Sequence, residues 1–125
     1  MAYSTVMVID SEESILDIIA IILEEANYRV IKHLSSPIIP FKHPVPDLII
    51  LNVGPNNRCN KDFFDLLKKY KSTLNIPVML TSTLQGLKSV AEFWKADSYL
   101  NKPFDLSFLL SQVRELTSKN HRVSV

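Results

Sequence analysis

Short, continuous apolar runs alternate along the chain with longer segments whose apolar residues recur at helical spacing. Continuous apolar runs are typical of parallel strands that are covered on both faces. They predict strands over residues 5–9, 28–31, 47–53, 76–80 and 98–100. Strands that alternate with helices in this way predict one α/β domain over residues 1–125, doubly wound around a five-stranded parallel sheet. We expect its core to span about residues 5–118 and residues 120–125 to form a loose tail.

Helices are predicted over residues 11–26, 62–70, 83–95 and from 105 to about 118. We expect Ser11 to cap the first helix, Asn27 to end it in the left-handed conformation, and Asp105 to cap the last. The expected inward faces are Ile15, Ile19, Ile22, Leu23 and Ala26 in the first helix, Leu87, Val90, Ala91 and Trp94 in the third, and Leu106, Leu109, Leu110, Val113 and Leu116 in the last. Residues 34–46 contain prolines at 37, 40, 44 and 46, so their structure stays open.

The charge and the metal-ligating residues exclude several classes of function. Lysine and arginine number 14 against 13 acidic residues, for a net charge of +1, and no segment forms a basic stripe. We therefore expect no binding to nucleic acid. Cys59 is the only cysteine, and the histidines His33, His43 and His121 lack metal-ligand spacing.

The apolar segments also predict no membrane contact. The N-terminus has no basic region ahead of an apolar stretch, so it does not resemble a signal peptide. The longest apolar stretch, residues 15–23, contains Asp17 and is too short to cross a bilayer. We therefore expect a cytoplasmic protein.

Polar residues gather where the predicted strands end. Asp10 and Ser11 follow the first strand, Asn52 ends the third, Thr81 ends the fourth, and Lys102 follows the fifth. Each residue alone is more often a structural cap than a functional group. Parallel sheets bind ligands beyond the carboxyl ends of their strands, so the group together predicts a functional pocket at that edge.

The blocks around these residues resemble the receiver domain of two-component response regulators. The resemblance is carried by Val8-Ile9-Asp10, Pro46-Asp47-Leu48-Ile49-Ile50-Leu51, Pro77-Val78-Met79-Leu80-Thr81 and Tyr99-Leu100-Asn101-Lys102-Pro103-Phe104. It covers about residues 5–118 and implies a flavodoxin-like sheet of strand order 2-1-3-4-5. In such domains, two acids after the first strand hold magnesium and an aspartate at the end of the third accepts a phosphoryl group from a histidine kinase.

The resemblance implies a role for each residue of the pocket. Asp10 matches the first acid, Thr81 the hydroxyl that contacts the phosphoryl oxygens, and Lys102 the lysine beside it. Tyr99 matches the aromatic residue that swings inward on activation. The remaining positions depart from the family, because Asn52 stands at the phospho-acceptor position and Ser11 at the second acid.

These departures change the chemistry that the pocket offers. An acyl phosphate needs a carboxylate nucleophile, and the amide of Asn52 cannot form one. The pocket of the family carries three acids and one lysine, a formal charge of −2, whereas Asp10 and Lys102 leave a formal charge of zero here. We expect weak magnesium binding or none, because this ion favours carboxylate oxygens. Asp10 and Lys102 can pair directly, with a gross attraction of about 4 kcal/mol at about 4 Å before desolvation.

The sequence therefore predicts a pseudo-receiver, a signalling module that binds proteins and is not an enzyme. The alternative is a phosphorelay receiver with an unusual acceptor; Ser11 is conceivable, but Asp47 begins the third strand, at the opposite edge of the sheet. A flavodoxin-type electron carrier is disfavoured by Glu12 and Glu13, which would repel a flavin phosphate. A small aspartyl phosphatase would need two acids flanking one residue, which Asp10-Ser11-Glu12 imitates poorly.

The expected partners are proteins, either a histidine kinase or an output protein. A homodimer is a second expectation, through the surface around Phe93, Trp94 and Tyr99. Asn52 fits two roles equally well: it fills an inherited pocket with hydrogen bonds, or it holds one conformation for a partner.

Overall fold

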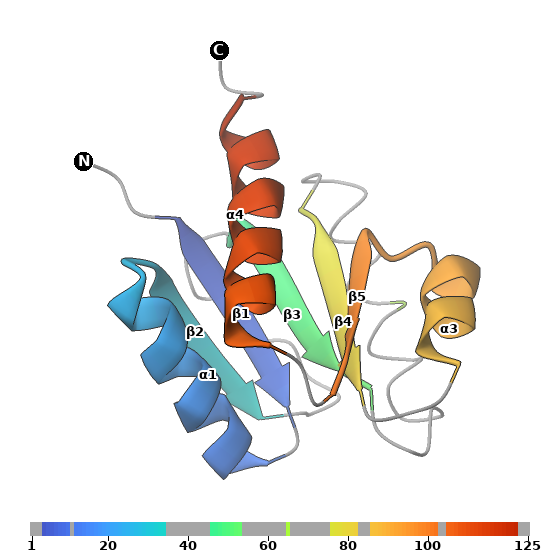
Figure 1. The fold of residues 1–125 in the computed structure, drawn as a ribbon, viewed down its shortest axis with the longest axis horizontal. Coiled ribbons are helices and arrows are strands. Elements are labelled where there is room, and N and C mark those ends of the chain that lie inside the picture. The colour runs from blue at the N-terminus through green and yellow to red at the C-terminus, as the bar shows by residue number, and fades with distance from the viewer. Residues whose placement is uncertain are drawn as a thin grey trace.

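A computed structural model of the protein describes residues 4–10, 12–34, 46–53, 65, 76–82, 86–102 and 105–122, with backbone alone for residues 119–122. The elements follow in the order β1 (Thr5–Asp10), α1 (Glu13–Glu25), β2 (Arg29–Leu34), β3 (Leu48–Asn52), β4 (Val78–Ser82), α3 (Leu87–Trp94), β5 (Ser98–Asn101) and α4 (Leu106–Arg122). The strands form one parallel sheet of order β2-β1-β3-β4-β5, which confirms the predicted α/β fold and strand order. In Figure 1 all strand arrowheads point toward the same edge of the sheet.

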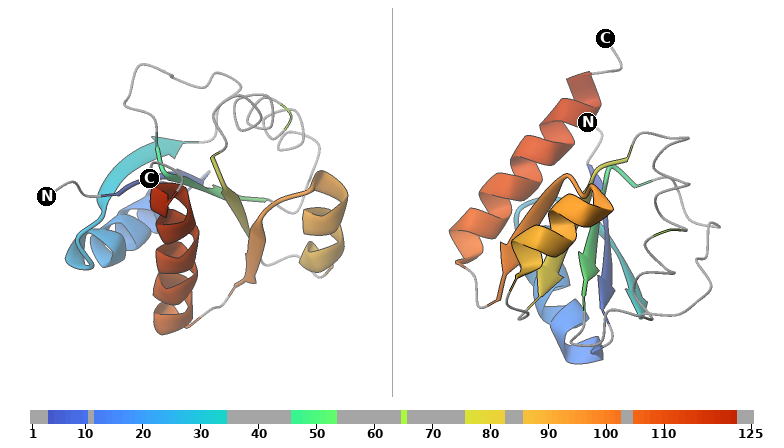
Figure 2. Two further views of the ribbon diagram at one scale, coloured as in Figure 1. Left: turned by 90° about the horizontal axis from the view of Figure 1, so that it is seen from above. Right: turned by 90° about the vertical axis from the view of Figure 1, so that its right-hand side faces the viewer.

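The two faces of the sheet are buried under different helices. Residues of one parity, such as Val8 and Ile50, pack with α1 and α4, in the core cluster Val6, Val8, Leu16, Ile19, Leu23, Leu48, Ile50, Met79, Leu100, Leu109, Val113 and Leu116. Residues of the other parity pack with α3, in the cluster Met7, Ile9, Ile49, Leu51, Val53, Ile76, Val78, Leu80, Leu87, Ala91 and Trp94. Figure 2 shows α1 and α4 together on one side of the sheet. Burial on both faces explains why these strands read as continuous apolar runs.

The helix caps follow the sequence signals in two of three cases. Asn27 has a φ of 71° directly after α1, as predicted for a left-handed cap. Asp105 accepts hydrogen bonds from the backbone N–H and the hydroxyl of Ser107, which confirms its capping role. At α1 the prediction was wrong, because Glu12 occupies the N-cap position and makes no side-chain capping bond. Ser11 itself lies outside the described residues.

Several predicted boundaries and faces need correction. The edge strand β2 continues to Leu34, because parallel pairing with β1 extends through the polar residues Lys32 and His33. The backbone of α4 is helical to Arg122 where a loose tail from residue 120 was expected; no glycine or proline interrupts it after residue 105. Leu106, in the first turn of α4, is 50% exposed and is not part of the inward face.

The inward face of α1 is rotated by about one residue from the predicted one. Leu16, Ile19, Ala20 and Leu23 are buried, whereas Ile15, Ile22 and Ala26 are only partly covered. Aliphatic residues occupy most positions from 15 to 23, so the apolar pattern fits several helix faces and contact with the sheet selects among them. The inward face predicted for α3 is confirmed, with Leu87, Ala91 and Trp94 buried and Val90 packed beside them.

Some predictions fall on residues that the structure does not describe. They include most of the predicted helix over residues 62–70, residues 35–45 and 83–85, the side chain of His121, and the positions of Cys59 and His43. Within the described elements, no helix combines the length and the apolar character that crossing a membrane requires.

Candidate functional site

The register of the sheet brings three of the predicted pocket residues to neighbouring strand ends. Asn52 and Thr81 are Cα partners between β3 and β4, and Ile9 pairs with Leu51, which sets Asp10 beside the end of β3. Asp10 and Thr81 are buried, with 2% and 1% exposure, while Asn52 is partly exposed. The carboxyl edge of the sheet therefore holds these residues together, as the sequence predicted.

The alternation of side chains along the strands turns these residues toward one face. Asp10 has the parity of Val6 and Val8, and Asn52 has the parity of Leu48 and Ile50, all of which pack on the side of α1 and α4. Thr81 likewise follows Met79 of the same cluster. The pocket residues thus lie on the same face of the sheet as this core cluster, at the edge where the strands end.

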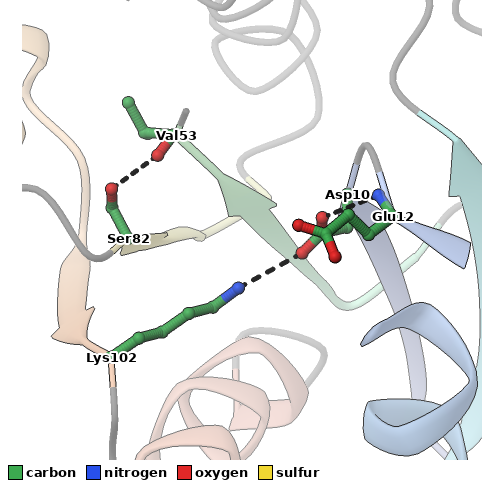
Figure 3. A network of polar contacts seen from close by, with 5 residues as sticks. All are labelled: Asp10, Glu12, Val53, Ser82 and Lys102. Atoms are coloured by element: carbon green, nitrogen blue, oxygen red, sulfur yellow. Dashed lines mark hydrogen bonds and ion pairs between the residues drawn. The ribbon is translucent and has the colours of Figure 1, made fainter. Parts of the chain in front are cut away.

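Asp10 and Lys102 form an ion pair at the carboxyl edge of the sheet. The Lys102 ammonium donates to the Asp10 carboxylate over 3.3 Å, across a sequence separation of 92 residues. Figure 3 shows the two side chains pointing toward each other, Asp10 from the end of β1 and Lys102 from beyond the end of β5. The carboxylate side chain is 2% exposed and the lysine side chain 18% exposed. The direct pairing predicted from the sequence is confirmed.

Asp10 uses both of its carboxylate oxygens. Oδ2 accepts the bond from Lys102, and Oδ1 accepts a 3.0 Å hydrogen bond from the backbone N–H of Glu12. The same side chain therefore holds the turn between β1 and α1 and receives the lysine that follows β5. A carboxylate with two donors, one of them charged, is a satisfied buried anion.

A second set of bonds ties together the ends of β3, β4 and β5. The buried Ser82 hydroxyl donates to the carbonyl of Val53, and the backbone N–H of Val53 donates to the carbonyl of Thr81 over 2.8 Å. The backbone N–H of Lys102 donates to the carbonyl of Ser82 over 2.7 Å. The sequence analysis did not identify Ser82, although it is part of a hydroxyl run, Thr81-Ser82-Thr83, at a strand end.

Two other residues from the sequence analysis lie away from the pocket or at its margin. The Asp47 carboxylate accepts a 2.7 Å hydrogen bond from the backbone N–H of Thr5, at the amino edge of the sheet. This position supports the view that Asp47 is a poor phospho-acceptor. Tyr99 is 37% exposed on β5, and Ser98 beside it donates to the Gln112 side chain of α4 over 3.0 Å.

The described donor atoms fit magnesium poorly. Asp10 is the described carboxylate at the position of the family's metal site, and its oxygens already accept from Glu12 and Lys102. The part of the chain that the structure describes contains no group of three or more His, Cys, Asp or Glu side chains that could hold a metal ion. Magnesium favours several oxygen ligands without a competing cation, and the lysine ammonium is such a competitor.

The chain is similar to known proteins both in sequence and in structure. No protein-family model matches the chain. The DNA-binding dual master transcriptional regulator RpaA of Synechocystis is 28% identical over 123 residues, which cover 94% of this chain and 51% of RpaA. The phosphate regulon transcriptional regulatory protein PhoB of Klebsiella pneumoniae is 27% identical over 118 residues, covering 87% of this chain and 49% of PhoB. The chain thus spans about half the length of these curated relatives.

Solved structures match nearly the whole chain. A CheY-like response regulator receiver domain from Methanospirillum hungatei superposes with a TM-score of 0.78 at 19% identity, covering 97% of this chain and 98% of that one. A response regulator receiver modulated diguanylate cyclase from Pelobacter carbinolicus gives a TM-score of 0.73 at 25% identity, with 97% of each chain covered. The chain has the receiver fold of response regulators. The two sequence relatives are both transcriptional regulators by name.

We predict that removing Lys102 and removing the charge of Asp10 have unequal effects on stability. Lys102→Met leaves the buried Asp10 carboxylate without its charged partner, so the free energy of unfolding should fall by about 2–4 kcal/mol. Asp10→Asn should cost only about 1 kcal/mol, because the amide oxygen still accepts from Glu12 and the lysine can reach water. Urea unfolding followed by the fluorescence of Trp94, the single tryptophan, measures both.

The matched control is Lys32→Met. Lys32 pairs with Asp17 over 2.9 Å, but the two side chains are 51% and 49% exposed, so solvent screens the pair and replaces it readily. This variant should unfold at the same urea concentration as the parent chain. Equal destabilisation by Lys102→Met and Lys32→Met would show that burial of the Asp10 carboxylate adds nothing to the cost.

Proposed function

We propose that this receiver-like domain is a signalling module that binds other proteins and operates without phosphotransfer. The observation that carries the proposal is Asn52 at the carboxyl end of β3, beside Asp10 and Lys102, whose opposite charges pair with each other. In receiver domains, which the chain resembles, the phosphoryl acceptor stands at this strand end. An amide there provides no carboxylate for an acyl phosphate, so no residue of this pocket is assigned a catalytic role.

The charge of the pocket supports the same proposal. The formal charges of Asp10 and Lys102 cancel, and the second acid of the family is replaced by Ser11. Divalent ions gain little in a site without net negative charge, so we propose that magnesium binds weakly or not at all. The phosphoryl-transfer reaction depends on such an ion to offset charge on the moving group.

Asn52 then has a structural role. Its position between buried Asp10 and buried Thr81 calls for a polar side chain without charge, because a second carboxylate would repel Asp10. We propose that Asn52 keeps the pocket in one arrangement, with Lys102 held by Asp10. A pocket that keeps one arrangement presents its partners with a fixed surface.

The surface formed by β5, α3 and α4 is the proposed contact between two copies of the chain. An open groove of about 1030 Å³ lies there, and its lining includes Glu92, Lys95, Tyr99, Asp105 and Phe108. The exposed aromatic residues Tyr99 and Phe108 line the groove together with charges of both signs. This combination suits a two-fold contact in which each copy supplies both partners of an ion pair. Trp94, which the sequence leaves open between the core and the interface, is 7% exposed and belongs to the core.

We predict that the chain forms no acyl phosphate. Incubation with acetyl phosphate and magnesium should leave the intact mass unchanged, because Asn52 offers no carboxylate nucleophile. Addition of one phosphoryl group that hydroxylamine removes would contradict the proposal and support a phosphorelay receiver with another acceptor. A phosphoryl group that resists hydroxylamine would point to the hydroxyl of Ser11.

Two variants serve as controls for this assay. Asn52→Asp alone should be labelled slowly, since the second acid is still missing, and it should lower stability modestly through repulsion with Asp10. Ser11→Asp combined with Asn52→Asp restores the formal charge of −2 and should be labelled rapidly. Rapid labelling of Asn52→Asp alone would show that Ser11 is no obstacle.

We also predict that Phe93 and Tyr99 contribute to self-association. The two side chains are 77% and 37% exposed, so Phe93→Ser combined with Tyr99→Ser removes apolar contact area without opening the core. Sedimentation equilibrium should show a dimer of the parent chain whose dissociation constant rises at least about tenfold in the variant. A parent chain that stays monomeric, or a variant dimer of unchanged affinity, would contradict this interface.

A further inference from the structure

The carboxyl end of β4 makes hydrogen bonds to the chain beyond both of its neighbours in the sheet. The Ser82 hydroxyl donates to the carbonyl of Val53, just beyond β3 (Figure 3), and the Ser82 carbonyl accepts from the N–H of Lys102 over 2.7 Å, just beyond β5. The Val53 N–H donates to the carbonyl of Thr81 over 2.8 Å. We name these four residues the strand-end network. Ser82 is its central member, because it bonds in both directions.

Burial keeps water from replacing the bonds between β3 and β4 in this network. Ser82, Thr81 and Val53 are each 1% exposed. β3 ends at Asn52, so the carbonyl of Val53 lies beyond the last residue of the strand. A buried carbonyl in that place needs a donor, and the hydroxyl of Ser82 provides one. The side chain of Ser82 therefore holds the residue that directly follows Asn52.

The Ser82 side chain lies on the face of the sheet opposite to the pocket. Along β4 it has the parity of Leu80, whose core cluster packs with α3. Thr81 has the other parity and lies on the side of α1 and α4, as Asp10 and Asn52 do. The ion pair of the pocket thus holds the strand ends on one face of the sheet, and the Ser82 hydroxyl holds β3 to β4 on the other face.

The amino end of β4 is held as well. The backbone N–H of Val78 donates to the carboxylate of Asp97 over 2.8 Å, and the Asp97 N–H donates to the carbonyl of Val78 over 3.0 Å. Asp97 directly precedes β5, so β4 and β5 are bonded at both of their ends. A shift of β4 along β5 would have to break these bonds, and a polar group that is left buried without its partner is costly. Movement of β4 is thereby opposed at each end, and Ser82 opposes it beside the pocket.

We propose that Ser82 is a positioning residue that holds the pocket in a single arrangement. The inference rests on the proposed function and adds a second residue, on the opposite face of the sheet, to the role given there to Asn52. The Ser82 hydroxyl holds the chain directly after Asn52, and the Ser82 carbonyl holds the backbone from which Lys102 reaches Asp10. A displacement of Asn52 or of Lys102 therefore strains a bond to Ser82. Without the hydroxyl, the ends of β3 and β4 separate more often.

Amide hydrogen exchange followed by NMR tests the proposal on the parent chain first. The N–H groups of Val53 and Lys102 lie just past the ends of their strands, where local opening is usually easy. If the strand-end network holds these ends, both amides should exchange about as slowly as those of Ile50 and Leu80, inside β3 and β4. Exchange of Val53 or Lys102 at least about tenfold faster than at these two positions would overturn the proposal.

Ser82→Ala then removes the hydroxyl with little change in side-chain volume. It leaves the buried carbonyl of Val53 without this donor, so the amides of Val53 and Lys102 should exchange at least about tenfold faster than in the parent chain. The amides of Ile50 and Leu80 should change only by the factor that the loss of global stability, measured by urea unfolding, predicts. Equal acceleration of all four amides would show that the hydroxyl contributes stability alone, and would overturn the positioning role.

The matched control is Thr117→Val, which removes another buried hydroxyl at nearly constant volume. Thr117 is 3% exposed and donates to the carbonyl of Val113 over 2.8 Å, within α4. After correction for global stability, this variant should leave the exchange of Val53 and Lys102 unchanged, and acceleration equal to that of Ser82→Ala would contradict the proposal. The measurement uses neither phosphodonor nor magnesium, so its failure would leave the proposed loss of phosphotransfer intact. Labelling of the parent chain by acetyl phosphate would contradict the proposed function without changing these exchange rates.

Discussion

A buried carboxylate needs a cation, and the pocket of this protein is organised by how Asp10 obtains one. Lys102, which follows the edge strand β5, supplies the positive charge. The backbone N–H of Glu12 donates a hydrogen bond to the second carboxylate oxygen. Desolvation makes such a pair costly to break from one side, although its net contribution to stability can be small. The pair therefore fixes where Lys102 lies relative to the end of β1.

The parallel sheet makes this pairing possible. Every strand ends at the same edge, so residues far apart in sequence meet there without any local signal between them. The hydrogen bonds of Ser82, Val53 and Lys102 tie the ends of β3, β4 and β5 together at that edge. Asn52 at this edge carries no charge, and the charges of Asp10 and Lys102 pair with each other.

The helices that surround the sheet carry two exposed surfaces. α1 and α4 cover one face and leave distinct outer surfaces, one acidic with an isoleucine ridge and one aromatic beside an open groove. Both surfaces stand on elements whose inner faces are deeply buried. Substitutions on the outer surfaces therefore test binding with little effect on the core.

The sequence predicted best those strands that are buried on both faces of the sheet. The central strands are apolar on both faces, so β1, β3 and β4 were recognisable as continuous runs, and their parallel arrangement placed Asp10, Asn52 and Thr81 together. The sequence predicted least well the inward face of α1, because its aliphatic residues are compatible with several faces. It also missed the second half of β2, because the polar residues there are held in a strand by pairing with β1. Ser82 was missed because its bond is to a backbone carbonyl, and the hydroxyl run Thr81-Ser82-Thr83 does not show which of its members makes such a bond.

The account depends on a pocket whose charge is neutralised by its own residues. Calorimetric titration of magnesium into the parent chain, and into the chain with Ser11→Asp and Asn52→Asp, tests this most directly. The account predicts no saturable binding by the parent chain and clear binding by the double variant, which regains a formal charge of −2. Saturable binding of magnesium by the parent chain, in the range of cellular concentrations, would contradict it.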